Sequence, residues 1–102
     1  MQNQDSTEIT KRFFDALQKL KANGIIRGKQ TFARKYNIDN RNFYKAEKDM
    51  NRNIFQTSWL LYLVRDYYVS AHWLLTGEGS FLRTIFGKDF ENFANNLQRK
   101  NK

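Results

Sequence analysis

The stretch from Lys29 to Lys48 constrains the fold of this chain more than any other, because it predicts two short helices joined by a three-residue turn. Asn37 is expected to open the turn with a positive φ, a conformation that asparagine tolerates better than any residue except glycine. Asp39 follows as the expected N-cap of the second helix, which begins at Asn40. The apolar residues expected to press the two helices together and onto a core are Phe32, Ala33, Tyr36, Ile38, Phe43 and Ala46. This pattern is typical of a helix-turn-helix.

The length and composition favour one domain. With 102 residues, 40% of them hydrophobic and 16% aromatic, the chain can bury a core but is too short for two sizeable domains. Cysteine is absent, which excludes disulfides and thiolate chemistry and is compatible with a reducing compartment. No apolar run approaches the roughly 18 residues that span a bilayer, and the start MQNQDSTEIT lacks the pattern of a signal peptide. We therefore expect a cytoplasmic protein without a membrane partner.

The net charge of +8 is concentrated around the predicted helix-turn-helix. Residues 11 to 52 contain twelve Lys and Arg against four Asp and Glu, whereas residues 53 to 82 carry a net charge of −1 and residues 83 to 102 one of +3. A basic segment that coincides with a reading helix is typical of a surface that binds phosphates. The alternative is a solvated basic face without a ligand.

Helix is also predicted for most of the remaining chain. The first helix is expected to begin near Ser6, with Asp5 and Glu8 in a spacing like that of a capping box, and to end at Asn23-Gly24. Its expected core positions are Ile9, Phe13, Ala16, Leu17 and Leu20. The helices of the motif are expected at about 29–36 and 40–48, followed by a polar loop at 49–57.

A fourth helix is expected to begin near Ser58, its expected N-cap, and Ser70 is expected to cap a short fifth helix that ends at Gly77. The expected buried face of the fourth helix is Trp59, Leu60, Leu63, Val64 and Tyr67. A last amphipathic helix is expected from Lys88. The sequence thus predicts an all-α fold with a five-helix domain over residues 1–80 and a C-terminal helical extension over residues 81–102.

The helix-turn-helix pattern, followed by HWLLTGEG at His72 to Gly79, resembles the lambda-repressor-like (XRE-type) family of phage and bacterial transcriptional regulators. The resemblance covers roughly residues 8 to 80. It implies a compact five-helix domain whose third helix enters the major groove, with Trp73 and its neighbouring leucines holding the fifth helix against the first and fourth. It also implies a repressor-like regulator, either a small stand-alone one or the amino-terminal part of a larger protein.

The helix over 40–48 carries the candidate base-reading residues Asn40, Arg41, Tyr44 and Lys45. Arg41 can donate two hydrogen bonds to guanine, and Asn40 can pair with adenine; a good bidentate contact of this kind contributes about 1 to 3 kcal/mol of discrimination. Tyr44 has two interpretations, because its ring could contact a sugar or a thymine methyl group or could cover the edge of the core. The same helix brings Lys45 round to the same side.

The candidate phosphate contacts surround this helix. The resemblance places Lys29 at the start of the second helix, where its side chain or its backbone N–H would meet a phosphate. The further candidates are Arg27, Gln30, Arg34, Lys48 and Arg52. Charged side chains commonly lie on a solvated face, and that alternative applies to each of them.

The C-terminal segment is rich in aromatic residues, and its candidate dimerisation residues are Phe86, Phe90, Phe93 and Leu97. Together with Phe81 and Ile85 they exceed what one small core needs. They could join two copies on a pseudo-palindrome with half-sites about 34 Å apart, bind another protein, or fold back onto the domain. The second of these is the alternative function, a helical protein-interaction module.

Other classes of function have weaker support in the sequence. No glycine-rich phosphate loop, no cluster of metal ligands and no nucleophile with a nearby base is visible, so we expect neither an enzyme nor a cofactor, metal or small-molecule ligand. His72 is the single histidine and is expected on the surface. RNA binding is a third option, although no aromatic sheet motif of RNA-binding domains is present. Double-stranded DNA is therefore the expected partner, with a homodimer as the expected state.

Overall fold

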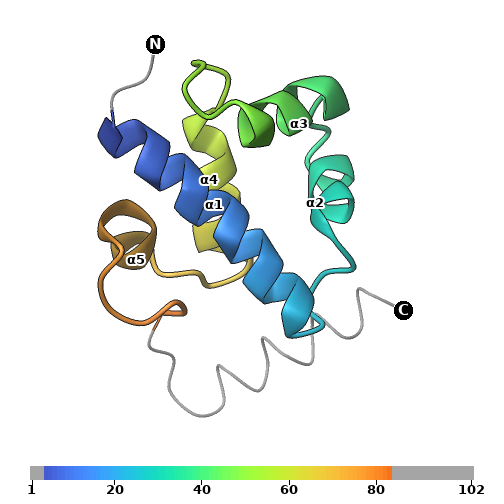
Figure 1. The fold of residues 1–102 in the computed structure, drawn as a ribbon. Helices are drawn as coiled ribbons and strands as arrows, with labels where there is room; N and C mark the ends of the chain where they lie inside the picture. Colours follow the sequence, from blue (N-terminus) through green and yellow to red (C-terminus); the bar gives the residue numbers. More distant parts are fainter. Residues whose placement is uncertain (1–3, 84–102) are drawn as a thin grey trace.

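The computed structural model describes residues 4–83, which form five α-helices around one core (Figure 1). Their bounds are α1 Gln4–Ala22, α2 Lys29–Lys35, α3 Asn40–Lys48, α4 Thr57–Asp66 and α5 Ala71–Thr76. The longest helix, α1, packs against α2, α3 and α5, while α4 packs against α5. The expected all-α fold is confirmed. Over residues 4–83 no helix has both the length and the apolar composition needed to cross a bilayer.

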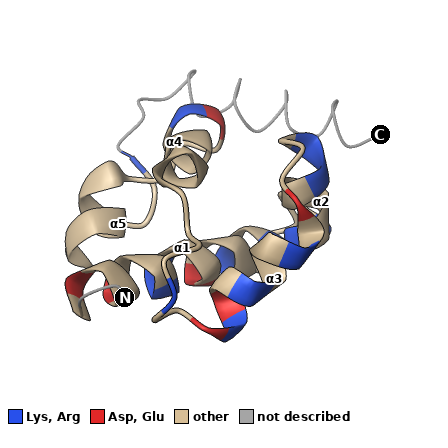
Figure 2. Ribbon diagram, turned by 90° about the horizontal axis from the view of Figure 1, so that it is seen from above, with Lys and Arg blue, Asp and Glu red and all other residues tan. Residues whose placement is uncertain are grey.

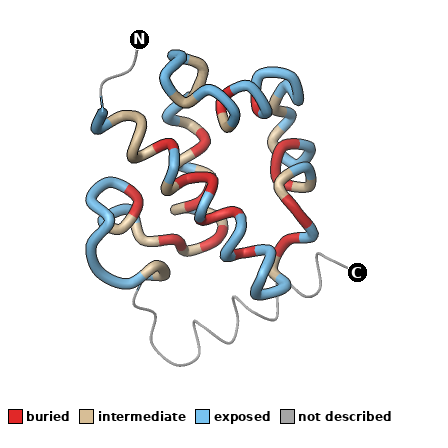
Figure 3. Tube along the Cα trace, viewed as in Figure 1, coloured by how far each residue is buried: buried red, intermediate tan, exposed pale blue. Residues whose placement is uncertain are grey.

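Aromatic rings fill the centre of the core. Phe13 of α1 is fully buried, and its ring meets Phe32, Phe43 and Phe55 edge to face at centroid distances of 5.1 to 6.2 Å. These edge-to-face contacts are the favourable geometry for aromatic pairs. Because Phe32 lies in α2 and Phe43 in α3, the rings fix both helices of the motif on α1. The buried positions on the inner sides of α1, α2 and α3 are visible in Figure 3.

The first and fourth helices begin one or two residues before the expected positions, and the expected N-cap of the fourth helix was wrong. The first helix begins at Gln4, before Ser6, and Asp5 lies in its first turn, where a carboxylate faces the positive end of the helix dipole. The fourth helix begins at Thr57, and its N-cap is Gln56 in an extended conformation, so Ser58 lies inside the helix. A serine followed by an apolar run signals a cap only statistically, and here the chain turns helical earlier.

The core face of α1 also differs in detail from the prediction. Ile9 is half-buried, whereas Thr10 and Phe14 are buried. Thr10 can be buried because its hydroxyl donates a hydrogen bond to the Ser6 carbonyl at 3.0 Å, which satisfies the polar group within the helix. The remaining expected core positions of this helix, from Phe13 to Leu20, are buried.

The turn between α2 and α3 has the predicted geometry. Asn37 adopts φ 55°, and the Asp39 carboxylate accepts a hydrogen bond from the Asn42 backbone N–H at 2.9 Å. Helix α2 ends at Lys35, and Tyr36 is its C-cap. The amino end of α3 is therefore capped by the last residue of the turn.

The last described segment returns to the domain. The Ser70 N–H donates to the Phe81 carbonyl and the Arg83 N–H to the Tyr68 carbonyl, each at 2.8 Å. The Phe81 ring meets Trp73 at 5.0 Å, so this residue of the expected extension packs on α5. As predicted, Ser70 caps α5 and Gly77 ends it with φ 81°. The dimerisation candidates Phe86, Phe90, Phe93 and Leu97 lie outside the described residues.

Candidate nucleic-acid interface

The outer side of α3 carries a line of three cations. Arg41, Lys45 and Lys48 are spaced four and three residues apart, which places them on one face of a helix, and all three are exposed. The opposite face consists of Phe43 and Ala46, which are 0% and 1% exposed. Among residues 4–83 none of the three cations forms an ion pair. We call Arg41, Lys45 and Lys48 the cationic stripe.

Polar and aromatic side chains flank the cationic stripe on the side of α2. Asn40 and Tyr44 of α3 line a concave surface of about 640 Å³ together with Gln30 and Arg34 of α2. Tyr44 is 36% exposed, and its ring also meets the Phe43 ring edge to face at a centroid distance of 6.3 Å. Both interpretations of this tyrosine are therefore compatible with its position, since one edge touches the core and the rest faces solvent.

On the other side of the cationic stripe, Asn42 lies beside the amino end of α4. It lines a smaller concavity with Gln56 and Ser58, and its backbone N–H is held by the Asp39 cap. The face that α3 presents is thus bounded by α2 on one side and by α4 on the other. A helix of nine residues is about 14 Å long, which is the scale of the width of a major groove.

The candidate phosphate residues differ in what they contact. Arg27, Gln30, Arg34, Lys48 and Arg52 are exposed. Lys29 is half-buried, and its ammonium group contacts Glu47 Oε1 at 2.6 Å and lies over the Tyr44 ring at 5.6 Å. Lys29 therefore has a carboxylate partner on α3, which its place in the sequence did not predict.

Basic residues gather over the half of the domain that holds α1, α2 and α3. Figure 2 shows Lys and Arg on these helices and on the loop that follows α3, whereas α5 carries none. In the opposite half, Arg65 of α4 is paired with Asp66 at 2.9 Å. The positive potential expected from the charge distribution is thus directed to the side of the cationic stripe.

A tyrosine and an aspartate join α2 to α4 behind the turn. The Tyr36 hydroxyl donates to Asp66 Oδ2 at 2.5 Å, and its ring stacks on Tyr62 with a centroid distance of 4.1 Å and an interplanar angle of 3°. Burial and this hydrogen bond raise the pKa of Tyr36 far above its usual value. The hydrogen bonds from Arg65 and Tyr36 hold the pKa of Asp66 below its usual value. This contact fixes the residue that immediately precedes Asn37.

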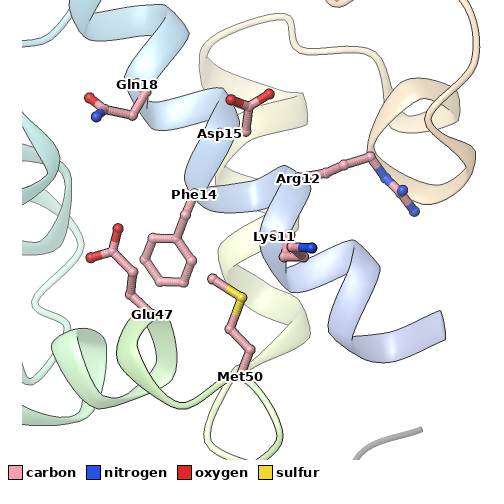
Figure 4. Close-up of a pocket in the computed structure, with 7 residues that line it drawn as sticks. All are labelled: Lys11, Arg12, Phe14, Asp15, Gln18, Glu47 and Met50. Carbon is pink, nitrogen blue, oxygen red and sulfur yellow. The ribbon is translucent and has the colours of Figure 1, made fainter. Parts of the chain in front are cut away.

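An apolar hollow lies between α1 and the carboxyl end of α3. It has a volume of about 430 Å³, and Phe14 and Met50 point toward one another within it, with Glu47 beside them (Figure 4). Arg12 borders the hollow but points toward α5, where it donates to the Leu74 and Leu75 carbonyls at 2.7 and 2.9 Å. The hollow is separate from the cationic stripe, which lies on the outward face of α3.

No family model, no curated protein and no solved structure matches this chain. The resemblance to lambda-repressor-like regulators thus stays a prediction from the residues of the motif and of HWLLTGEG.

Proposed function

We propose that this protein binds double-stranded DNA in a sequence-specific manner, with α3 in the major groove, and acts as a transcriptional regulator of the phage or bacterial repressor type. The observation that carries the proposal is the cationic stripe. Three cations project from a helix whose opposite face is locked in the core by Phe43 and Ala46. A short, rigidly held helix with basic and amide side chains on its outer face is the part that a helix-turn-helix inserts between the strands of a duplex.

The residues divide by role according to their position on α3. Asn40 and Arg41 lie in the first turn of α3, the part that recognition helices direct at base edges, and Lys45 lies one turn further along the same face as Arg41. Tyr44 lies beside them and is placed to meet a sugar or a thymine methyl group. The remaining cations and amide, which would contact phosphates and fix the register on the duplex, are Arg27, Gln30, Arg34, Lys48 and Arg52.

Selection of bound sequences from a pool of random duplexes, at near-physiological salt, tests this function. We expect a short enriched sequence. Arg41→Ala should lose about 1 to 3 kcal/mol of preference at one base pair. The matched control Lys48→Ala should weaken binding to all duplexes alike and lower the dependence of log K on log salt by about 0.9. A pool without enrichment, or equal losses for every duplex with Arg41→Ala, would contradict direct readout.

We further propose that the protein acts as a homodimer in the cytoplasm, on half-sites about 34 Å apart. The aromatic residues beyond Arg83 are the candidates for joining the copies. Sedimentation of the full chain and of a chain ending after Arg83 tests this, since Phe81 to Arg83 pack on the domain and must be kept. A monomer in both cases would contradict the dimer.

The second candidate function is a helical protein-interaction module that acts through the aromatic C-terminal segment. Two exposed leucines, Leu61 of α4 and Leu75 of α5, are 50% and 53% exposed and give the domain apolar surface away from the cationic stripe. A full chain that leaves every duplex unbound at low salt yet sediments as a complex with a partner protein would favour this function.

A further inference from the structure

A lysine and a glutamate tie the start of α2 to the carboxyl half of α3. Lys29 Nζ lies 2.6 Å from Glu47 Oε1, with the side chains 40% and 30% exposed. The distance is that of a charge-assisted hydrogen bond, and the partial burial weakens the screening by solvent. The same ammonium group lies 5.6 Å from the centroid of the Tyr44 ring. We call Lys29 and Glu47 the α2–α3 ion pair.

The α2–α3 ion pair differs from the charges of the cationic stripe. The cations of the stripe form no ion pair among residues 4–83, and Glu47 is the only acidic residue within α3. Because the carboxylate neutralises the ammonium group at short range, the pair as a whole adds no net charge to the attraction of phosphates. A phosphate that approached Lys29 would also approach Glu47 and be repelled by it.

We propose that Glu47 lowers the affinity of this surface for DNA of arbitrary sequence by neutralising Lys29 at short range. Binding to arbitrary sequences depends almost entirely on the number of phosphates that a protein neutralises. The pair therefore limits the electrostatic attraction of duplexes of any sequence. This inference rests on the proposed function.

The test measures the salt dependence of binding to a mixed-sequence duplex for the wild type and Glu47→Gln. With Glu47 neutral, Lys29 becomes free to attract phosphate, so binding should tighten and the slope of log K against log salt should steepen by about 0.9. Glu78→Gln is the matched control, because it makes the same change in net charge beyond the end of α5, and its slope should stay that of the wild type.

A double variant, Lys29→Gln with Glu47→Gln, distinguishes two cases: either Glu47 neutralises Lys29, or Lys29 binds a phosphate despite Glu47. If the two charges cancel, the double variant should have the slope of the wild type. An unchanged slope for Glu47→Gln together with a shallower slope for the double variant would overturn the inference, because Lys29 would then bind phosphate despite Glu47. Equal steepening in Glu78→Gln would also overturn it. A wild type that binds no duplex at any salt would overturn the proposed function as well.

Discussion

Asp39 gives the sharpest test of how the turn between α2 and α3 stabilises the amino end of α3. Its carboxylate accepts a hydrogen bond from the first turn of α3, at 2.9 Å from the Asn42 nitrogen. Replacing such a cap by alanine costs about 0.5 to 2 kcal/mol, and because water can reach this exposed end of α3 we expect a loss of about 1 kcal/mol for Asp39→Ala. For a domain of this size, that corresponds to a fall in the melting temperature of about 4 to 8 °C.

The matched control for this prediction is Asp39→Asn, because asparagine caps helices as well as aspartate does and the same charge is removed. We expect this variant to lose only the attraction between the carboxylate and the helix dipole, about 0.3 kcal/mol at moderate salt. Urea unfolding followed by circular dichroism and tryptophan fluorescence measures both losses, and Trp59 is buried against Phe43 of α3. Equal losses in the two variants, or no loss with Asp39→Ala, would refute the capping role.

Three further predictions concern the contacts that hold the helices of the domain together. Tyr36→Phe removes the hydroxyl that donates to Asp66 but keeps the ring on Tyr62, so the free energy of unfolding should fall by about 1 kcal/mol in urea titrations. Because Arg65 and Tyr36 lower the pKa of Asp66 from 3.8, its contribution to stability is present above that pH and is lost as the pH falls below it. Asp66→Asn should therefore flatten the loss of stability in acid, and an acid limb like that of the wild type would contradict this. Phe13→Ala empties the centre of the aromatic core and should cost about 3 to 5 kcal/mol, measured by thermal unfolding; a cost below 1 kcal/mol would contradict its central place.

The parts of the fold that were predictable depend on local rules. Asn37 with its positive φ, Asp39 and Ser70 as caps and Gly77 as a helix stop each follow from what one residue does to its own neighbourhood. The bounds of α3 and the burial of Phe43 follow from helical periodicity. A short turn between two strongly patterned helices leaves the sequence few alternatives.

The contacts that were missed join residues far apart in the chain. The Tyr36 hydroxyl reaches Asp66, and Arg12 caps the end of α5, across 30 and 62 or more residues. The Lys29 partner lies 18 residues away on α3. Lysine, arginine and tyrosine side chains are long and reach several candidate partners, so their pairing depends on how the helices pack and has no local signature.

The candidate site was predictable in its exposure but not in its electrostatics. Placing Phe43 and Ala46 inward fixes the outward direction of Arg41 and Lys45, because the helix repeat allows no other arrangement. The contact between Lys29 and Glu47 depends on how α2 and α3 cross, and the spacing of residues along the sequence does not predict that crossing.

The central claim is that the outer face of α3 meets the duplex, and nuclear magnetic resonance tests it most directly. A ¹⁵N-labelled full chain is titrated with the duplex obtained by selection, and shift changes are mapped residue by residue. We predict the largest changes at Arg41, Lys45 and Lys48 and at the adjoining residues of α2. Changes confined to α4 and α5, or no change at saturating duplex, would contradict the claim.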